Sequence, residues 1–231
     1  MTEILRYELR DSVALLRFDD GRANVASHAS IDAIHSALAR AEKEASAALL
    51  LGRPGRFSAG FDLAVINQGA AASRALVTAG GELLVRIVES EIPVVAACSG
   101  HALAMGALLL LAADYRIGAS GEFKLGLNEV AIKLTLPIFA LELARARIAR
   151  EQLTRATTLA EVYDPAGALA AGYLDRVVAP EQLEGEALTV AGQLAKLSLP
   201  AYRATKRKLR GALVERIRAT LKQDMAGWDV P

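Results

Sequence analysis

The sequence is poor in cysteine and histidine, and this scarcity excludes several classes of protein. Cys98 is the single cysteine among 231 residues, so a disulfide framework within the chain is excluded, which fits a reducing compartment. Cys98 lies in an apolar run, and we interpret it as a buried, unreactive thiol. His28 and His35 have no third ligand to accompany them, so we expect no metal site.

Neither sign of charge dominates, and no apolar run is long enough to cross a bilayer. The 27 basic and 26 acidic residues leave a net charge of +1, which gives no general argument for nucleic acid or an acidic membrane surface. The longest apolar run, 102–113, is too short for a membrane span. The start, Met1–Glu3, lacks the pattern of a signal peptide. We therefore expect a cytoplasmic protein with no nucleic-acid or membrane partner.

Strand and helix patterns alternate over the first part of the chain. Extended patterns cover 4–10, its hairpin partner 13–18, 47–51, 93–98 and 115–119. Helical patterns cover 30–44, with Ser30 as the expected N-cap, then 80–89 and 105–113, while 52–60 is a glycine-rich loop. This repeat predicts an α/β fold with a largely parallel sheet and helices outside it.

Helical patterns dominate after Pro137. They cover 138–148, 151–159, 165–171, 180–197 and a last basic helix after Pro200, with one strand at 176–178. We place a soft domain boundary near residue 175, which divides the chain into a core, 1–175, and a C-terminal helical region, 176–231. The alanine-rich segment 69–75 is expected to be flexible, or at most weakly helical.

Two short loops carry the chemistry. Small residues in Phe57–Leu63 let a ligand approach the backbone closely, and the amide of Phe61 follows Gly60. The segment Gly100–Gly106 follows a buried strand and opens a buried helix, whose first amides lack internal partners and lie at its positive end. Either loop alone also fits a plain tight turn or a helix packed through small residues.

Together the two loops resemble the acyl-CoA site of the crotonase family, the enoyl-CoA hydratases and isomerases, over nearly the whole chain. Phe57–Leu63 matches the family pattern F-[SA]-A-G-x-D-[LI]. Pro93–Gly106 matches the strand and glycine-rich turn, with Ala104 and Met105 in place of two glycines. The resemblance implies an oxyanion hole for a thioester carbonyl, with the amides of Phe61 and Met105 as donors.

The catalytic carboxylates depart from the family pattern. The first glutamate of the family corresponds to Leu108, whereas the second corresponds to Glu129, with Asn128 where proline is usual. A carboxylate in an otherwise apolar stretch should have a raised pKa, which suits a base that works near neutral pH. A structural or solvated glutamate is the plainer alternative.

One base favours double-bond migration over hydration. Hydration of a 2-enoyl-CoA uses two carboxylates in this family, whereas a single base can move a proton from the alpha to the gamma carbon. We therefore expect an enoyl-CoA isomerase that converts 3-enoyl-CoA to 2-enoyl-CoA. The alternatives are an enoyl-CoA hydratase or acyl-CoA hydrolase, a non-catalytic acyl-CoA binding protein, and a plain α/β scaffold without a ligand.

The resemblance also implies how the substrate is held. Coenzyme A carries phosphates, so Arg22, Arg56 and the basic helix 202–210 are candidates for its rim. The remaining candidates for substrate contact are Ala59, Gly60, Asp62, Leu63, His101 and Leu108. No cofactor is expected beyond the coenzyme A of the substrate. The family folds as a spiral of strand–strand–helix units with a helical region that packs in trimers, often paired into hexamers.

Overall fold

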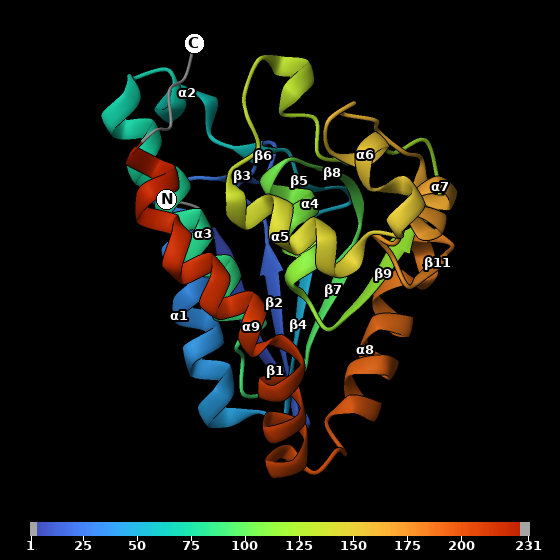
Figure 1. Ribbon diagram of the computed structural model, residues 1–231. Helices are drawn as coiled ribbons and strands as arrows, with labels where there is room; N and C mark the ends of the chain where they lie inside the picture. Colours follow the sequence, from blue (N-terminus) through green and yellow to red (C-terminus); the bar gives the residue numbers. More distant parts are fainter. Residues whose placement is uncertain (1–3, 227–231) are drawn as a thin grey trace.

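A six-stranded sheet lies at the centre of the structure (Figure 1), a computed structural model that describes residues 4–226. Its order is β1-β2-β4-β7-β9-β11. The hairpin β1–β2 is antiparallel and every other neighbouring pair is parallel, which confirms the predicted α/β class. The strands are β1 (Leu5–Arg10), β2 (Val13–Phe18), β4 (Ala47–Gly52), β7 (Val94–Cys98), β9 (Tyr115–Ala119) and β11 (Arg176–Val178).

Helices cover both faces of this sheet, so its central strands are apolar on both sides. All six residues of β4 are buried. Leu50 belongs to the large core that it shares with α1 (His28–Glu44), α3 (Ala70–Val88) and α4 (Met105–Ala112). Leu49, its neighbour in the strand, belongs to a smaller core under α8 (Leu183–Leu194) on the opposite face. Cys98 is buried, and burial raises the pKa of its thiol to about 12, as expected for an unreactive cysteine.

Two small sheets carry the loops of interest. One has the order β10-β8-β5 and joins β10 (Leu125–Gly126), β8 (Gly100–Leu103) and β5 (Gly55–Ser58). The other pairs β3 (Val25–Ala26) with β6 (Gly60–Phe61). The expected glycine-rich loop therefore contains strands, and the start of the second loop is extended before α4 begins.

Two helix starts differ from the expectation. Ser27, not Ser30, is the N-cap of α1: the Ser27 hydroxyl accepts the Ser30 amide at 3.2 Å and the Ser30 hydroxyl accepts the Ser27 amide at 2.9 Å. This reciprocal capping box starts the helix one turn early. The alanine-rich segment, expected to be flexible or at most weakly helical, forms the first turns of α3 after Gly69. Alanine favours the helix, and the residues that follow, from Leu76 on, anchor it in the core.

The C-terminal half is mainly helical, as expected, although its segments are broken differently. The helix expected over 151–159 is only a 3-10 turn followed by the short α6, and the one expected over 180–197 ends at Leu194. The elements are α2 (Leu63–Ile66), a 3-10 turn (Val130–Ile132), α5 (Ile138–Arg147), a 3-10 turn (Arg150–Gln152), α6 (Leu153–Ala156), α7 (Pro165–Ala171), a 3-10 turn (Pro180–Gln182) and α9 (Leu199–Ala226). Because β11 pairs with β9, the residues after 175 complete the main sheet; the domain boundary there stays a prediction.

The last helix, α9, runs beside α3 (Figure 1) and is fastened by an ion cluster. Lys206 is 7% exposed, and its ammonium lies 2.9 Å from a carboxylate oxygen of Asp114, which also accepts the Tyr202 hydroxyl. Arg210 reaches the same carboxylate. Arg203 pairs with Glu91. Arg203, Lys206 and Arg210, three basic residues of α9, therefore hold this helix in place.

No helix within residues 4–226 combines the length and apolar character that a bilayer span requires.

Loss of the Asp114 charge should destabilise the fold. We expect Asp114→Asn to lower the free energy of unfolding by about 3 kcal/mol, because the buried ammonium of Lys206 loses its counter-ion. Lys208→Ala, an exposed change on the same helix, should stay within about 0.5 kcal/mol of the parent. Urea unfolding at pH 7 measures both, and equal midpoints for the two variants would contradict the assigned role of the cluster.

The residue before α4 has a backbone conformation that suits glycine. Ala104 has φ 49° and ψ −119°, a region that side chains disfavour. Its amide donates to the Gly126 carbonyl and its carbonyl accepts the Leu108 amide, both at 3.0 Å. These two bonds hold Ala104 where the helix must start, so the backbone strain is retained in the folded state.

Relief of this strain should stabilise the protein. We expect Ala104→Gly to raise the free energy of unfolding by about 1 kcal/mol, since the strain removed exceeds the extra entropy that glycine gives the unfolded chain. Ala107→Gly, inside the same helix, should lower it by at least about 1 kcal/mol. Thermal unfolding compares the two, and a lower melting temperature for Ala104→Gly would refute the strain at this position.

Candidate active site

The two loops singled out in the sequence lie against each other in the structure. Gly60 has φ 99°, and a Cβ added to it would lie 3.0 Å from the Ala104 Cβ and 3.7 Å from the Met105 nitrogen. A Cβ on Gly106 would lie 2.4 Å from the Ser58 carbonyl oxygen. The backbones therefore meet with no side chain between them, as the glycines permit.

This contact between the two loops brings together the backbone around the two expected donor amides, those of Phe61 and Met105. Met105 is the first residue of α4, so its N–H has no acceptor within the helix and lies at the positive end of the helix dipole. Phe61 follows Gly60 in β6, and its ring fills the space over Gly80, where a Cβ would lie 2.5 Å from it. A polarised carbonyl placed between these amides would meet two backbone donors.

A small, mainly apolar cavity opens beside these amides. Its volume is about 160 Å³. Five of the residues expected from the sequence line it: Ala59, Phe61, Leu63, Leu108 and Glu129. The other lining residues were not among the predicted substrate contacts, because apolar side chains carry no chemical signal in a sequence. They are Ile66, Val77, Ala104, Ile132, Leu134 and Pro137, together with the polar Asn128.

Glu129 supplies the carboxyl group in this cavity. Its side chain precedes a 3-10 turn and is 6% exposed. Its Oε2 atom is buried without a hydrogen-bond partner, and no ion pair among the described residues includes it. Burial raises the pKa of this carboxyl to about 7, against a smaller opposing effect of its own backbone amide. A group with this pKa can both take and return a proton near neutral pH.

Leu108 occupies the position where the family pattern has its first glutamate. It is 1% exposed and lies one turn into α4, in the wall of the same cavity. The site therefore has an aliphatic side chain where the family pattern has its first carboxylate. Glu82 is exposed on α3 and does not line the cavity.

Asp62 and His101 do not line the cavity. Asp62 is the N-cap of α2, and its carboxylate accepts the Ala64 amide at 2.9 Å. His101 is half-buried; its Nδ1 accepts the Lys124 amide at 3.0 Å. Burial lowers the pKa of His101, and the nearby charges of Arg56 and Lys124 lower it further. Each side chain thus has a local structural partner.

The two arginines proposed for the rim are exposed. Arg22 lies in the turn before β3, and its carbonyl accepts a hydrogen bond from Arg53 at 2.8 Å. Arg56 lies on β5 opposite His101. Arg53, which also pairs with Asp19, was missed by the sequence analysis, although it belongs to the same Gly-Arg-Pro-Gly turn. Both candidate arginines lie outside the cavity wall.

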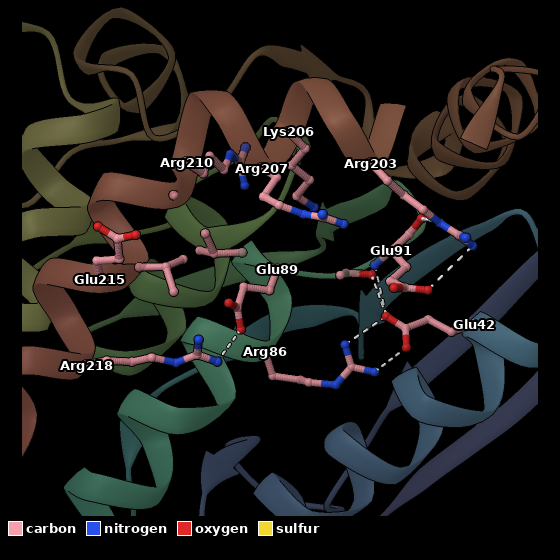
Figure 2. Close-up of a pocket in the computed structure, with 14 residues that line it drawn as sticks. Glu42, Arg86, Glu89, Glu91, Arg203, Lys206, Arg207, Arg210, Glu215 and Arg218 are labelled. Atoms are coloured by element: carbon pink, nitrogen blue, oxygen red, sulfur yellow. Dashed lines mark hydrogen bonds and ion pairs between the residues drawn. The ribbon is translucent and has the colours of Figure 1, made fainter. Parts of the chain in front are cut away.

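A larger hollow lies elsewhere, between α1, α3 and α9, and Figure 2 shows its charged lining. Its volume is about 500 Å³. Glu42 pairs with Arg86 and Glu89 with Arg218 across it. These two carboxylates are neutralised by their partners, and Glu215, which has no partner among the described residues, is exposed. The hollow therefore lacks the buried unpartnered acid that the smaller cavity holds.

Comparison with known proteins identifies the family of this chain. Residues 8–227 match the family model described as enoyl-CoA hydratase/isomerase. The human mitochondrial enoyl-CoA delta isomerase 1 is 30% identical over 210 residues, which cover 89% of this chain and 70% of the relative.

Solved structures agree with this match. An enoyl-CoA hydratase/isomerase family protein from Pseudomonas syringae has a TM-score of 0.95 and 43% identity, covering 97% of this chain and 98% of its own. An enoyl-CoA isomerase from Mycobacterium tuberculosis has a TM-score of 0.94 and 34% identity, covering 99% of this chain and 100% of its own. The chain has the crotonase fold, and it belongs to the enoyl-CoA hydratase/isomerase family as an enzyme of that type.

Proposed function

We propose that this enzyme moves the double bond of a 3-enoyl-CoA thioester to position 2. The observation that carries the proposal is that Glu129 supplies the one carboxyl in a mainly apolar cavity that Leu108 also lines. A family member that hydrates its substrate would hold a second carboxylate at that position. The similarity to the human delta isomerase supports the same reaction.

The geometry suits a single-base mechanism. Glu129 removes a proton from the alpha carbon, and the electron pair of that bond moves to the thioester oxygen to give an enolate. The amides of Phe61 and Met105 donate to this oxygen, and one such donor contributes about 3 kcal/mol at the transition state. The enolate then collapses, the double bond forms between the alpha and beta carbons, and Glu129 returns the proton to the gamma carbon.

The remaining parts of the proposal concern binding. Arg22 and Arg56 would contact the phosphates of coenzyme A, while Ala59, Gly60 and Leu63 would contact the pantetheine and adenine parts. No cofactor is needed, because the proton is the only species transferred and Glu129 carries it. An assembly into trimers or pairs of trimers, and a cytoplasmic location, stay predictions.

Removal of the carboxylate should abolish isomerisation. We expect Glu129→Gln to lower kcat by about 10²–10⁴-fold, the usual contribution of a general base, with acyl-CoA binding retained. Glu82→Gln, an exposed change on α3, serves as the matched control. Chromatographic assays with 3-enoyl-CoA measure the rate, and parallel assays with 2-enoyl-CoA measure hydration and thioester hydrolysis.

The outcomes separate the alternatives. If 2-enoyl-CoA reacts with water faster than 3-enoyl-CoA is isomerised, the result would favour a hydratase or a hydrolase. Binding of acetyl-CoA without turnover of any substrate would favour a non-catalytic binding protein. A full isomerisation rate in Glu129→Gln would exclude the proposed base.

The raised pKa of Glu129 also predicts that this residue lowers the free energy of unfolding as the pH rises. A glutamate has a pKa near 4.5 when exposed and about 7 here, so the folded state binds the proton more tightly than the unfolded state. The stabilisation from the protonated form is complete below about pH 4.5 and is lost as the pH rises through 7. We expect Glu129→Gln to exceed the parent in unfolding free energy by about 1–3 kcal/mol at pH 8, with a smaller difference at pH 5. Urea unfolding at both pH values measures this, and a pH-independent difference would contradict the assigned pKa.

A further inference from the structure

The residues that line the small cavity differ widely in exposure, which shows where the cavity opens and where it closes. Leu63 and Ile132 are 55% and 45% exposed, so they mark its mouth. Ile66, Val77 and Leu108 are 4%, 1% and 1% exposed, so they mark its floor. A ligand can therefore enter from the side of Leu63 and Ile132.

The floor of the cavity is made by three helices that pack on one another. Ile66 comes from α2, Val77 from α3 and Leu108 from α4, and α3 contacts both α2 and α4. All three side chains belong to the large core, and the hollow between α1, α3 and α9 shares no lining residue with this cavity. Protein interiors are close-packed with few voids, so the cavity ends at these three side chains.

The chemistry of an acyl-CoA decides which end of it enters the cavity. Coenzyme A is charged and far larger than the cavity, so it stays outside the mouth. In the proposed reaction the thioester carbonyl accepts from the amides of Phe61 and Met105, and the alpha carbon beside it meets Glu129. The rest of the acyl chain is apolar, and the buried aliphatic floor is the surface that can take it out of water.

The volume of the cavity limits the length of this chain. It is about 160 Å³, close to the roughly 150 Å³ of a dry apolar cavity that takes up one benzene molecule. Benzene has six carbon atoms, so an acyl chain of about six carbons would fill the cavity. A longer chain would have to displace core side chains, which a close-packed interior resists.

We propose that the enzyme selects short-chain 3-enoyl-CoA thioesters, with acyl chains of about four to six carbons, and that Val77 sets this limit. Ile66 lies on the four-residue α2, whereas Val77 lies within the 19-residue α3. That helix is packed against α1, α4 and α9, so Val77 is the less yielding part of the floor. The inference rests on the proposed function, because it names the substrate class of the same site.

Binding of saturated acyl-CoA thioesters tests the length limit without any turnover. We expect the Kd to fall about fourfold for each methylene from acetyl-CoA to hexanoyl-CoA, the gain from burying one methylene. The gain should end there, and decanoyl-CoA should bind at least about tenfold more weakly than hexanoyl-CoA. Isothermal titration calorimetry with the intact chain measures the series, and affinity that keeps rising through decanoyl-CoA would overturn the limit.

Variants at the floor test the role of Val77. Val77→Ala removes two methyl groups there, so the tightest-binding thioester should change from hexanoyl-CoA to octanoyl-CoA. Val85→Ala is the matched control, since Val85 is a buried valine of the same helix outside the cavity wall, and it should keep hexanoyl-CoA as the tightest ligand.

A larger side chain at the same position tests the limit in the opposite direction, and it serves if the alanine variant folds poorly. We expect Val77→Leu to weaken hexanoyl-CoA about tenfold and to bind butanoyl-CoA as the parent does. The same preferred length in the parent and both Val77 variants, or an equal change in Val85→Ala, would overturn the role of Val77.

Turnover separates this inference from the proposed reaction. A preferred chain length that changes with residue 77, in a protein that isomerises no 3-enoyl-CoA, would support the short acyl pocket and refute the isomerase proposal. Isomerisation of 3-decenoyl-CoA with the same kcat/KM as 3-hexenoyl-CoA would support the reaction and overturn the length limit.

Discussion

The site depends on a direct contact between two stretches of backbone. Gly60 lies against 103–105, and Gly106 lies against Ser58, each at a distance that a Cβ would violate or strain. Any side chain inserted there would push β6 away from the start of α4, and the two candidate oxyanion donors with it. Misplacement of a catalytic group by about 1 Å can cost about 10²-fold in rate. The strained Ala104 is a further consequence, because the helix must begin where this contact puts it.

The same packing decides what the carboxyl can do. With two amides at one side and aliphatic side chains around it, Glu129 has lost its water without gaining a counter-ion, and its pKa rises to about 7. A second carboxylate at Leu108 would share this dry space and would force the two groups to different pKa values. The leucine removes that coupling. It leaves one group that can alternate between acid and base, which is what proton transfer between two carbons of one substrate requires.

Much of this arrangement could be predicted because its signals are local in sequence. Phe57–Leu63 and Gly100–Gly106 each combine a buried strand with small residues, and their order identified the family. The cap of α1 was placed one turn late because Ser27 and Ser30 are equally good capping residues, and only their reciprocal bonding distinguishes them. The alanine-rich start of α3 was expected to be flexible or at most weakly helical, since the helix is stabilised by the packing of its later residues.

The contacts of the region after Pro137 change how this region should be understood. In the sequence it resembles a helical appendage whose main role is assembly. In the structure its strand completes the main sheet, α9 is locked to Asp114, and Tyr163 and Tyr173 back the segment that holds Glu129. The candidate oxyanion donors, the amides of Phe61 and Met105, thus lie before residue 115, while Tyr163 pairs with Leu125, four residues before the candidate base.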